Sequence, residues 1–402
     1  MNVLLVSTSE RCGGGAIAAR RLMEALCQNG VKARMMVRDK QSDAVTVCKV
    51  GNKLPKALER LAVLPRCDFD RTRMWQADIA NVGIDITTTR EFQEADIIHL
   101  HWINQGMLSL GCIERILNSG KRVVWTLHDE WPYLGVCHYR GDCASTDCLT
   151  CPVLKGSLPH RLLVRKLALY RQHSITFAGC SQWITNEARK AMPDADVRHI
   201  NNCIPARLFH PTDMAEARCQ LGLPTDRQLL LFCSQKVTDE RKGIRYLSEA
   251  LRLLPAERLH LVIVGKDAEQ IPLPDGISVT RLGSVAEQDM PQVYNAADCF
   301  LTPSLQDNLP NTIAEAMSCG TPCVGFRIGG IPEMIDHLEN GYVARYQDAC
   351  DLADGIRYVL SHELREAARH KAATAYGETH VAQQYLALYN SILTPQNDEC
   401  HR

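Results

Sequence analysis

The sequence lacks net charge, long hydrophobic runs and a basic leader, and each absence narrows the class of protein. Its 45 basic and 46 acidic residues leave a formal charge of -1, so no overall field favours nucleic acid or another polyanion as the partner. Nowhere do about 18 apolar residues follow one another, and Met1 leads directly into an apolar run without a basic segment. Neither a membrane-spanning helix nor export is indicated, and we expect a cytoplasmic protein.

The dinucleotide-binding pattern G-x-G-x-x-G is also missing, so a dehydrogenase interpretation rests only on the glycine run 13–15 and on Asp39. The run follows a strand-like segment and opens onto an amphipathic one. Backbone amides at such a helix N-terminus can approach a phosphate or an oxyanion, which makes Gly14 and Gly15 candidate binding residues. A plain tight turn is the alternative.

The chain alternates short strand-like runs with longer helix-like stretches, and this pattern predicts two doubly wound α/β domains with parallel sheets. A length of 402 residues with 46% hydrophobic content fits two cores. Expected strands are residues 2–6, 33–37, 96–101, 122–127, 174–178 and 197–200, then 229–233, 259–264, 278–282, 299–302 and 322–326. We place the domains at residues 1–200 and 212–376, joined by a proline-containing linker at 201–211. A terminal helix in 377–402 could pack back onto the first domain.

The strongest local signal runs from the strand end at Ser304 to Pro322. Asp307 follows the strand in a loop, Pro310 suits a first helical turn, and Glu315 falls about two turns inside the helix. Carboxylates in these places can accept hydrogen bonds from sugar hydroxyls, and the free amides of the first turn favour a diphosphate. A capped helix with a solvated acid is the alternative.

This segment resembles glycosyltransferase family 4, whose members carry two acids separated by seven residues and followed by A-x-x-x-G-x-P. Asp307 and Glu315 have that separation, and Ala316 to Pro322 fits the tail, although the family usually has Glu first. The resemblance implies the GT-B fold, two Rossmann-like domains facing a cleft. It also implies that Glu315 binds the nucleotide ribose and that Asp307 contacts the donor sugar. Asn308, Leu309, Asn311 and Thr312 of the same segment are further candidate donor-binding residues.

Two further segments resemble the family. Lys242-Gly243 matches a Lys-Gly pair that holds the donor diphosphate, and Lys236 stands where the family has Arg. Lysine keeps the charge but loses the planar two-pronged donor geometry of arginine. Gly329-Gly330-Ile331-Pro332-Glu333 resembles a G-G-x-P-E segment near the donor. A solvated basic turn and a plain turn before a helix are the respective alternatives.

In the first half, Thr126-Leu127-His128 resembles the family's T-x-H loop, whose histidine contacts the donor sugar. His128, Asp307, Lys236 and Lys242 are therefore the candidate catalytic residues. A histidine at a strand end is otherwise more often a satisfied surface residue. His99 and His101 end the preceding strand, and we expect them to point to opposite faces, with His101 on the acceptor side.

The resemblance implies a retaining glycosyltransferase without a metal at its chemical centre. It would move a sugar from a nucleotide diphosphate donor to a glycan or polyprenyl-linked acceptor, in a bacterial surface pathway such as capsule or lipopolysaccharide synthesis. A nucleotide-sugar epimerase and a non-catalytic sugar-nucleotide sensor are the competing interpretations. Donor hydrolysis with and without acceptor distinguishes the three.

Four cysteines, Cys137, Cys143, Cys148 and Cys151, have the spacing C-x5-C-x4-C-x2-C. Four thiolates within one loop suit a structural zinc ion, with free thiols or a regulatory disulfide as alternatives. The segment 155–173 mixes basic and apolar residues and suggests peripheral contact with the inner face of a membrane. A domain-covering helix with a solvated basic face is the more common explanation of such a pattern.

Overall fold

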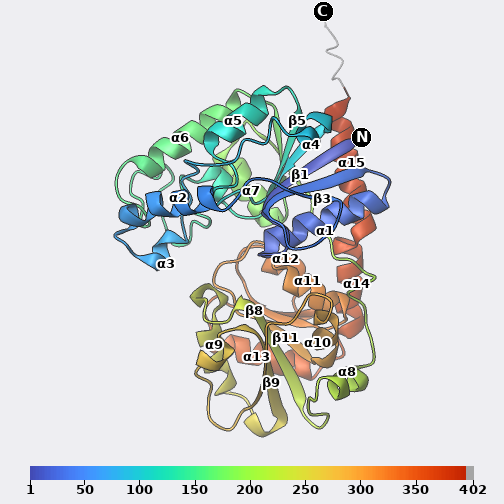
Figure 1. Ribbon diagram of the computed structural model, residues 1–402. Coiled ribbons are helices and arrows are strands. Elements are labelled where there is room, and N and C mark those ends of the chain that lie inside the picture. Colours follow the sequence, from blue (N-terminus) through green and yellow to red (C-terminus); the bar gives the residue numbers. More distant parts are fainter. Residues whose placement is uncertain (395–402) are drawn as a thin grey trace, which may run out of the picture. The chain divides into compact units, whose positions relative to one another are not determined.

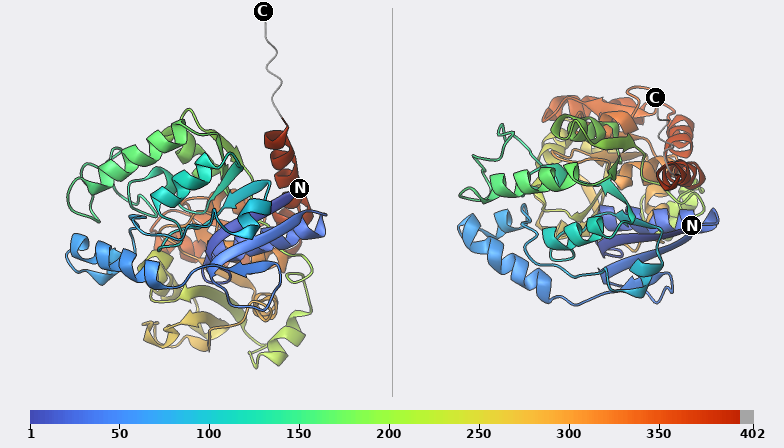
Figure 2. Two further views of the ribbon diagram at one scale, coloured as in Figure 1. Left: turned by 45° about the horizontal axis from the view of Figure 1, so that its top comes forward. Right: turned by 90° about the horizontal axis from the view of Figure 1, so that it is seen from above.

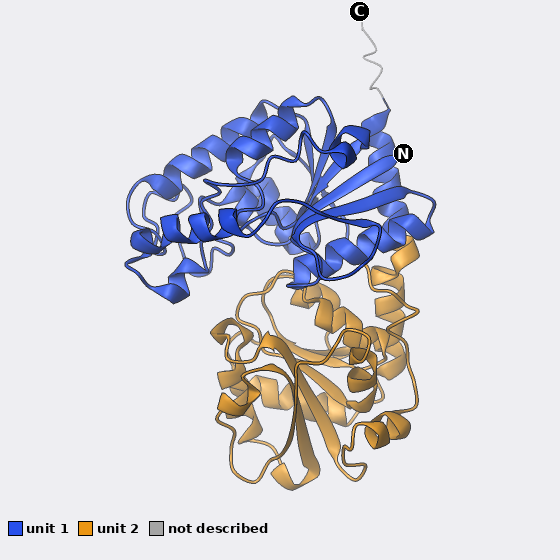
Figure 3. Cartoon of the chain, in the orientation of Figure 1, with its two compact units in different colours: residues 1–201, 381–402 blue, residues 202–380 orange. Residues whose placement is uncertain are grey.

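The computed structural model describes residues 1–394 and divides them into two compact units (Figures 1 and 3). The first unit contains residues 1–201 together with the chain from Val381 onward, and the second contains Asn202–His380. Each unit holds one parallel sheet flanked by helices (Figure 2). The prediction of two doubly wound parallel-sheet domains is confirmed.

Seven parallel strands form the sheet of the first unit, in the order β3-β2-β1-β4-β5-β6-β7. They are β1 (Asn2–Ser9), β2 (Lys32–Asp39), β3 (Val47–Lys49), β4 (Ile97–Leu100), β5 (Arg122–Leu127), β6 (Ile175–Gly179) and β7 (Asp196–His199). β1 is buried from Val3 to Ser9, as expected of a central strand covered on both faces. The strand order reverses between β1 and β4, and ligands of such sheets bind beyond the carboxyl ends of the strands at this point.

Side-chain caps determine where several helices of this unit begin. Ser109 caps α5 by accepting a hydrogen bond from the backbone N–H of Cys112, and Ser181 caps α7 through Ile184. The helices are α1 (Gly14–Gln28), α2 (Leu54–Val63), η1 (Leu64–Cys67), α3 (Arg71–Met74), α4 (Arg90–Glu94), α5 (Leu110–Asn118), η2 (Trp131–Tyr133), α6 (Leu158–Arg171), α7 (Gln182–Ala191) and α15 (Glu378–Leu393). None of the helices within residues 1–394 is long and apolar enough to cross a bilayer.

The last helix, α15, belongs to the first unit from Val381 onward. Tyr389 forms a hydrogen bond of 2.7 Å with Nδ1 of His99 in β4, and Tyr385 forms one of 3.0 Å with the hydroxyl of Thr126 in β5. All four side chains are buried. The end of the described chain therefore completes the polar contacts of two central strands.

The second unit has a six-stranded parallel sheet in the order β10-β9-β8-β11-β12-β13. Its strands are β8 (Gln228–Lys236), β9 (Leu259–Lys266), β10 (Ser278–Gly283), β11 (Cys299–Thr302), β12 (Cys323–Phe326) and β13 (Gly341–Ala344). Its helices are α8 (Met214–Gln220), η3 (Glu240–Lys242), α9 (Ile244–Leu251), η4 (Ala256–Arg258), η5 (Ala268–Gln270), α10 (Met290–Ala296), α11 (Asn311–Ser318), α12 (Ile331–Met334), α13 (Ala349–Leu360) and α14 (Arg365–Tyr376). The order reverses between β8 and β11, so a ligand is expected beyond the ends of these two strands.

Two edge strands, β3 and β13, were not predicted from the sequence. Each has three or four residues and pairs with a single neighbour, β2 or β12. A strand of this length is too short to show a periodic pattern of apolar residues, so its sequence is indistinguishable from that of a loop.

Candidate active site

In the second unit, Lys242 and Asp307 meet at the point where the strand order reverses. Lys242 ends η3, which follows β8, and Asp307 lies in the loop after β11. The ammonium Nζ is 2.6 Å from Oδ2 of Asp307, and the two side chains are 31% and 13% exposed. Ser304 also donates a hydrogen bond of 3.4 Å to the same oxygen. An accessible ammonium group held beside a carboxylate can bind an anionic ligand group without moving far.

The glycine pair at 329–330 packs against the backbone of the loop that carries Asp307. Gly329 has φ 55°, and a Cβ on it would lie 1.8 Å from the carbonyl oxygen of Asp307, so only glycine fits there. The N–H of Gly330 donates a hydrogen bond of 2.8 Å to the carbonyl of Asn308. The G-G-x-P-E segment therefore fixes the backbone that carries the first acid.

Glu315 lies inside α11, and its carboxylate is tied to the neighbouring helix α10. Oε2 accepts a hydrogen bond of 2.7 Å from the hydroxyl of Tyr294, which is fully buried, while Glu315 is 7% exposed. Burial and the adjacent carboxylate raise the pKa of Tyr294 well above its usual value, so the hydroxyl remains a donor. A carboxylate has two oxygens and can accept several hydrogen bonds at once, so this bond to Tyr294 does not by itself exclude a hydroxyl donor of a ligand.

The other predicted residues of this unit have different surroundings. Lys236, at the end of β8, is 64% exposed on its side chain and lies 3.8 Å from Asp267. Asn308 and Leu309 are buried, so they support the loop. The side-chain oxygen of Asn311 accepts a hydrogen bond from Asn202, and Thr312 is half-buried in the first turn of α11.

In the first unit, the glycine run and His128 are brought together. α1 begins at Gly14, and a Cβ on Gly15 would lie 3.0 Å from Cγ of the His128 ring, so the absence of a side chain permits this close approach. Nε2 of His128 is 2.9 Å from Nδ1 of His101. Burial lowers the pKa of His128 to about 4, so the ring is neutral at physiological pH.

The expectation that His99 and His101 point to opposite faces is wrong. Their ring centroids are 4.2 Å apart. Residues two apart in a strand share one face, and only immediate neighbours alternate. His99 is fully buried and bonded to Thr126 and Tyr389, and burial lowers its pKa to about 3. His101 alone lies beside His128.

A buried carboxylate next to His128, Asp129, was not among the predicted site residues. Its Oδ2 accepts hydrogen bonds of 2.8 Å from Trp102 Nε1 and from His138 Nδ1, and Oδ1 accepts one from the backbone of Trp131. Burial would raise the pKa of Asp129, but the charge and the hydrogen bond of His138 lower it below the usual value. The only sequence signal was its position directly after the T-x-H loop.

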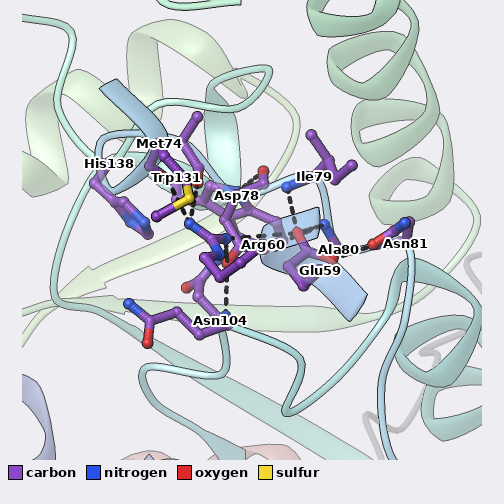
Figure 4. Close-up of polar contacts among 12 residues, drawn as sticks. Glu59, Arg60, Met74, Asp78, Ile79, Ala80, Asn81, Asn104, Trp131 and His138 are labelled. Atoms are coloured by element: carbon purple, nitrogen blue, oxygen red, sulfur yellow. Dashed lines mark hydrogen bonds and ion pairs between the residues drawn. The ribbon is translucent and has the colours of Figure 1, made fainter. Parts of the chain in front are cut away.

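A second buried polar group, also missed, joins α2 to the loop at residues 77–81 (Figure 4). Glu59 accepts backbone hydrogen bonds from Ile79, Ala80 and Asn81 at 2.8 to 3.2 Å. Arg60 bonds Asp78 at 3.1 Å, and both carboxylates are fully buried. Burial and the neighbouring Asp78 raise the pKa of Glu59 to about 8. The Glu59 carboxyl therefore keeps its proton up to about neutral pH in the folded protein.

The four cysteines of the loop after β5 are all free thiols in the structure. Cys137 and Cys151 share a hydrogen bond, which lowers the pKa of Cys151 to about 6, and the N–H of Leu154 donates to the Cys151 sulfur at 3.4 Å. Among the described residues, no group of three or more histidine, cysteine, aspartate or glutamate side chains is placed to hold a metal ion. The zinc site stays a prediction, which metal analysis of the purified protein tests.

The basic segment 155–173 forms α6, and one of its cations is not solvated. Lys166 is fully buried, donates a hydrogen bond of 2.5 Å to the carbonyl of Trp131 and lies 3.9 Å from the centroid of that ring. Burial lowers the pKa of Lys166 to about 7. α6 therefore has a smaller basic face than its sequence suggests.

Two Rossmann-like units, each built on one parallel sheet, are the architecture of the GT-B class of glycosyltransferases. Residues 227–362, which lie within the second unit, match the family described as glycosyl transferases group 1. Together with the relatives named below, this match shows that the protein is a glycosyltransferase. This match is consistent with the resemblance to glycosyltransferase family 4.

Curated relatives agree with this assignment. N-acetyl-alpha-D-glucosaminyl L-malate synthase of Bacillus anthracis is 23% identical over 314 residues, 75% of this chain and 76% of the relative. D-inositol 3-phosphate glycosyltransferase of Saccharomonospora viridis is 33% identical over 192 residues, and the match spans 44% of each protein.

The fold is shared with sucrose-phosphate synthase of Thermosynechococcus elongatus, with a TM-score of 0.69, 19% identity and coverage of 97% and 98% of the two chains. It is also shared with HepE of Anabaena in complex with UDP-glucose, with a TM-score of 0.65, 18% identity and coverage of 97% and 100%. At these identities the two structures establish the fold.

Proposed function

We propose that the second unit binds a nucleotide diphosphate sugar and that the protein transfers the sugar with retention of configuration. The observation that carries the proposal is the Lys242–Asp307 ion pair where β8 and β11 end, with Glu315 on the helix that follows. A structure of the same fold, HepE, was solved with UDP-glucose, which supports a nucleotide-sugar donor.

In the proposed reaction, Lys242 leaves its ion pair with Asp307 and binds the donor diphosphate. Lys236 adds a second positive charge beside the diphosphate. The Glu315 carboxylate accepts hydrogen bonds from the ribose hydroxyls, and the Asp307 carboxylate accepts one from a hydroxyl of the sugar. The bond from the sugar C1 to the diphosphate oxygen breaks while the acceptor oxygen bonds C1 on the same face. The acceptor proton passes to the leaving phosphate, whose growing negative charge the lysines stabilise.

His128 is proposed to contact the donor sugar. Its ring is neutral, so it can donate or accept a hydrogen bond with a hydroxyl group without placing a positive charge beside the oxocarbenium-like transition state. Gly15 and His101 hold the ring in place on either side.

For the acceptor we propose a glycan or polyprenyl-linked molecule, handled at the cytoplasmic face of the membrane in the synthesis of a surface polysaccharide such as capsule or lipopolysaccharide. A second candidate is a small hydroxy acid, because the Bacillus anthracis relative, which aligns with 75% of this chain, is named as a synthase of N-acetyl-alpha-D-glucosaminyl L-malate. Transfer assays with membrane extracts and with a panel of hydroxy acids separate these two acceptor classes.

The donor proposal is tested by thermal shift with a panel of UDP- and GDP-sugars. A ligand at about 100 times its dissociation constant adds about 2.7 kcal/mol of stability. Glu315→Ala should lose the shift, whereas Glu339→Ala, which removes an exposed acid of the same unit, should keep it. A full shift in Glu315→Ala contradicts the ribose assignment. Donor turnover without acceptor, or binding without turnover, would favour an epimerase or a sensor.

A further inference from the structure

Large apolar side chains are exposed in one short stretch of the first unit. Five of the twelve exposed large hydrophobic residues among residues 1–394 come from residues 54–75. They are Leu54, Leu58, Leu61, Phe69 and Trp75, whose exposed fractions range from 43% to 70%. Single exposed apolar residues are normal, but several on one side of one helix indicate an interaction surface.

The three leucines form one stripe along α2. Leu54, Leu58 and Leu61 are separated by four and three residues, so they project from the same side of the helix. The side that packs inward carries Glu59, Arg60 and Val63 instead. The helix therefore buries two ionisable side chains and exposes leucines, the reverse of an ordinary surface helix.

The buried contacts fix this orientation (Figure 4). Glu59 accepts hydrogen bonds from three consecutive backbone N–H groups, starting at Ile79. Arg60 donates to the carbonyls of Met74 and Ala77 and to Asp78. Rotating α2 to bury its leucines would break all of these bonds and leave buried charges unpaired. The fold therefore holds the leucine stripe at the surface.

The same stretch has an excess of exposed basic side chains. Lys53, Lys56, Arg66, Arg71 and Arg73 are exposed or half-buried, against the two acids Asp68 and Asp70. Asp68 is paired with Lys155 at 2.9 Å, and Asp70 lies 3.5 Å from Arg73. In Figure 1, α2 and α3 lie at the edge of the first unit, away from its sheet.

We propose that this α2–α3 surface, residues 53–75, docks onto an anionic lipid bilayer. The leucine side chains of α2 enter the boundary between headgroups and acyl chains, and the exposed lysines and arginines of the same stretch bind anionic headgroups. A second copy of the chain is a poorer occupant, because two such basic surfaces repel each other. Docking needs no donor or acceptor, so its failure leaves the proposed sugar transfer unaffected.

α6 is the other basic helix of this unit, and the structure favours the α2–α3 surface over it. Lys166 is buried, and Arg165 is paired with Glu114 at 3.2 Å. Val164 is the one large hydrophobic residue of α6 that is exposed. With one exposed valine and a partly neutralised basic face, α6 should bind a bilayer only weakly.

The test measures sedimentation of the full-length protein with vesicles of phosphatidylcholine alone or with about 30% phosphatidylserine. We expect about tenfold stronger partitioning onto the anionic vesicles, reduced by about 0.5 M salt. The double variant Leu58→Ser/Leu61→Ser and the double variant Arg71→Glu/Arg73→Glu should each lower partitioning about tenfold. All four side chains point to solvent, so the melting temperature should not change.

Matched controls are Val45→Ser, which removes a 91% exposed apolar side chain elsewhere in the first unit, and Val164→Ser on α6. Both should bind anionic vesicles like the parent protein. The proposal is overturned if the parent protein does not bind anionic vesicles, or if the leucine variant binds equally well. It is also overturned if Val164→Ser loses as much binding, or if the parent protein is a dimer that the leucine variant converts to a monomer.

Discussion

Replacing Lys242 with alanine separates its catalytic contribution from its structural one. In the structure its ammonium group is bonded to Asp307 at 2.6 Å, with the two side chains 31% and 13% exposed. Ion pairs this accessible to solvent contribute about 0.2 to 1 kcal/mol. Lys242→Ala should therefore lower the free energy of unfolding by no more than about 1 kcal/mol.

The expected effect on the reaction is larger. Negative charge grows on the leaving diphosphate, and removal of one preorganised donor at such a position costs about 2.7 to 4 kcal/mol. The value of kcat should fall about 100-fold to 1000-fold, and the KM for the donor should rise by a smaller factor, because the ground-state diphosphate already has its charge.

Initial-rate kinetics with the best donor, together with urea unfolding of the same preparation, measure both quantities. Lys371 is a matched control, since it forms an ion pair of 2.9 Å with Asp336 in the same unit and its side chain is 26% exposed. Lys371→Ala should change stability by a similar amount and leave kcat unchanged. The reasoning is refuted if Lys242→Ala raises KM without lowering kcat, or if both lysine variants lose activity equally.

Three other perturbations have defined outcomes. Tyr294→Phe should lower the free energy of unfolding by about 1.5 to 3 kcal/mol in urea titrations, because it removes a buried donor from the Glu315 carboxylate. The raised pKa of Glu59 means that the folded protein binds a proton which the unfolded chain releases, so stability should fall as pH rises from 4.5 to about 8. Glu59→Gln should flatten that part of the pH profile. Gly15→Ala places a methyl group 3.0 Å from the His128 ring and should lower the transfer rate, measured in steady-state assays.

Each of these expectations has an outcome that contradicts it. A Tyr294→Phe protein as stable as the parent would mean that the Glu315 carboxylate finds another donor or water. Stability that rises between pH 4.5 and 8 in the parent and in Glu59→Gln alike would assign the pH dependence to other groups. Unchanged transfer by Gly15→Ala would show that the His128 ring tolerates displacement.

The central strands could be predicted because each carries its own local signal. β1, β5 and β11 are apolar runs that start and end within a few residues of their predicted positions. The edge strands β3 and β13 depend on pairing with a neighbour that lies close only after folding. Their short sequences contain no period that distinguishes them from loops.

The candidate site was accessible to sequence reasoning where residues act in short motifs and inaccessible where they act through contacts distant in sequence. Lys242 and Asp307 were each identified in a motif, but their direct bond joins positions 65 residues apart. The bond between Tyr294 and Glu315 depends on how α10 packs against α11. The error over His99 was one of reasoning, because strand geometry already places it on the same face as its second neighbour.

The first unit is closed by the last helix of the chain, since Tyr385 and Tyr389 complete the hydrogen bonds of central strands. During translation, the ribosome therefore finishes the whole second unit, Asn202–His380, before the first unit receives its final segment. At roughly 5 to 20 residues per second, this delay is on the order of ten seconds or more. For that interval the surface that α15 covers is open to chaperones and proteases, so the length of the second unit sets how long the nascent first unit needs protection.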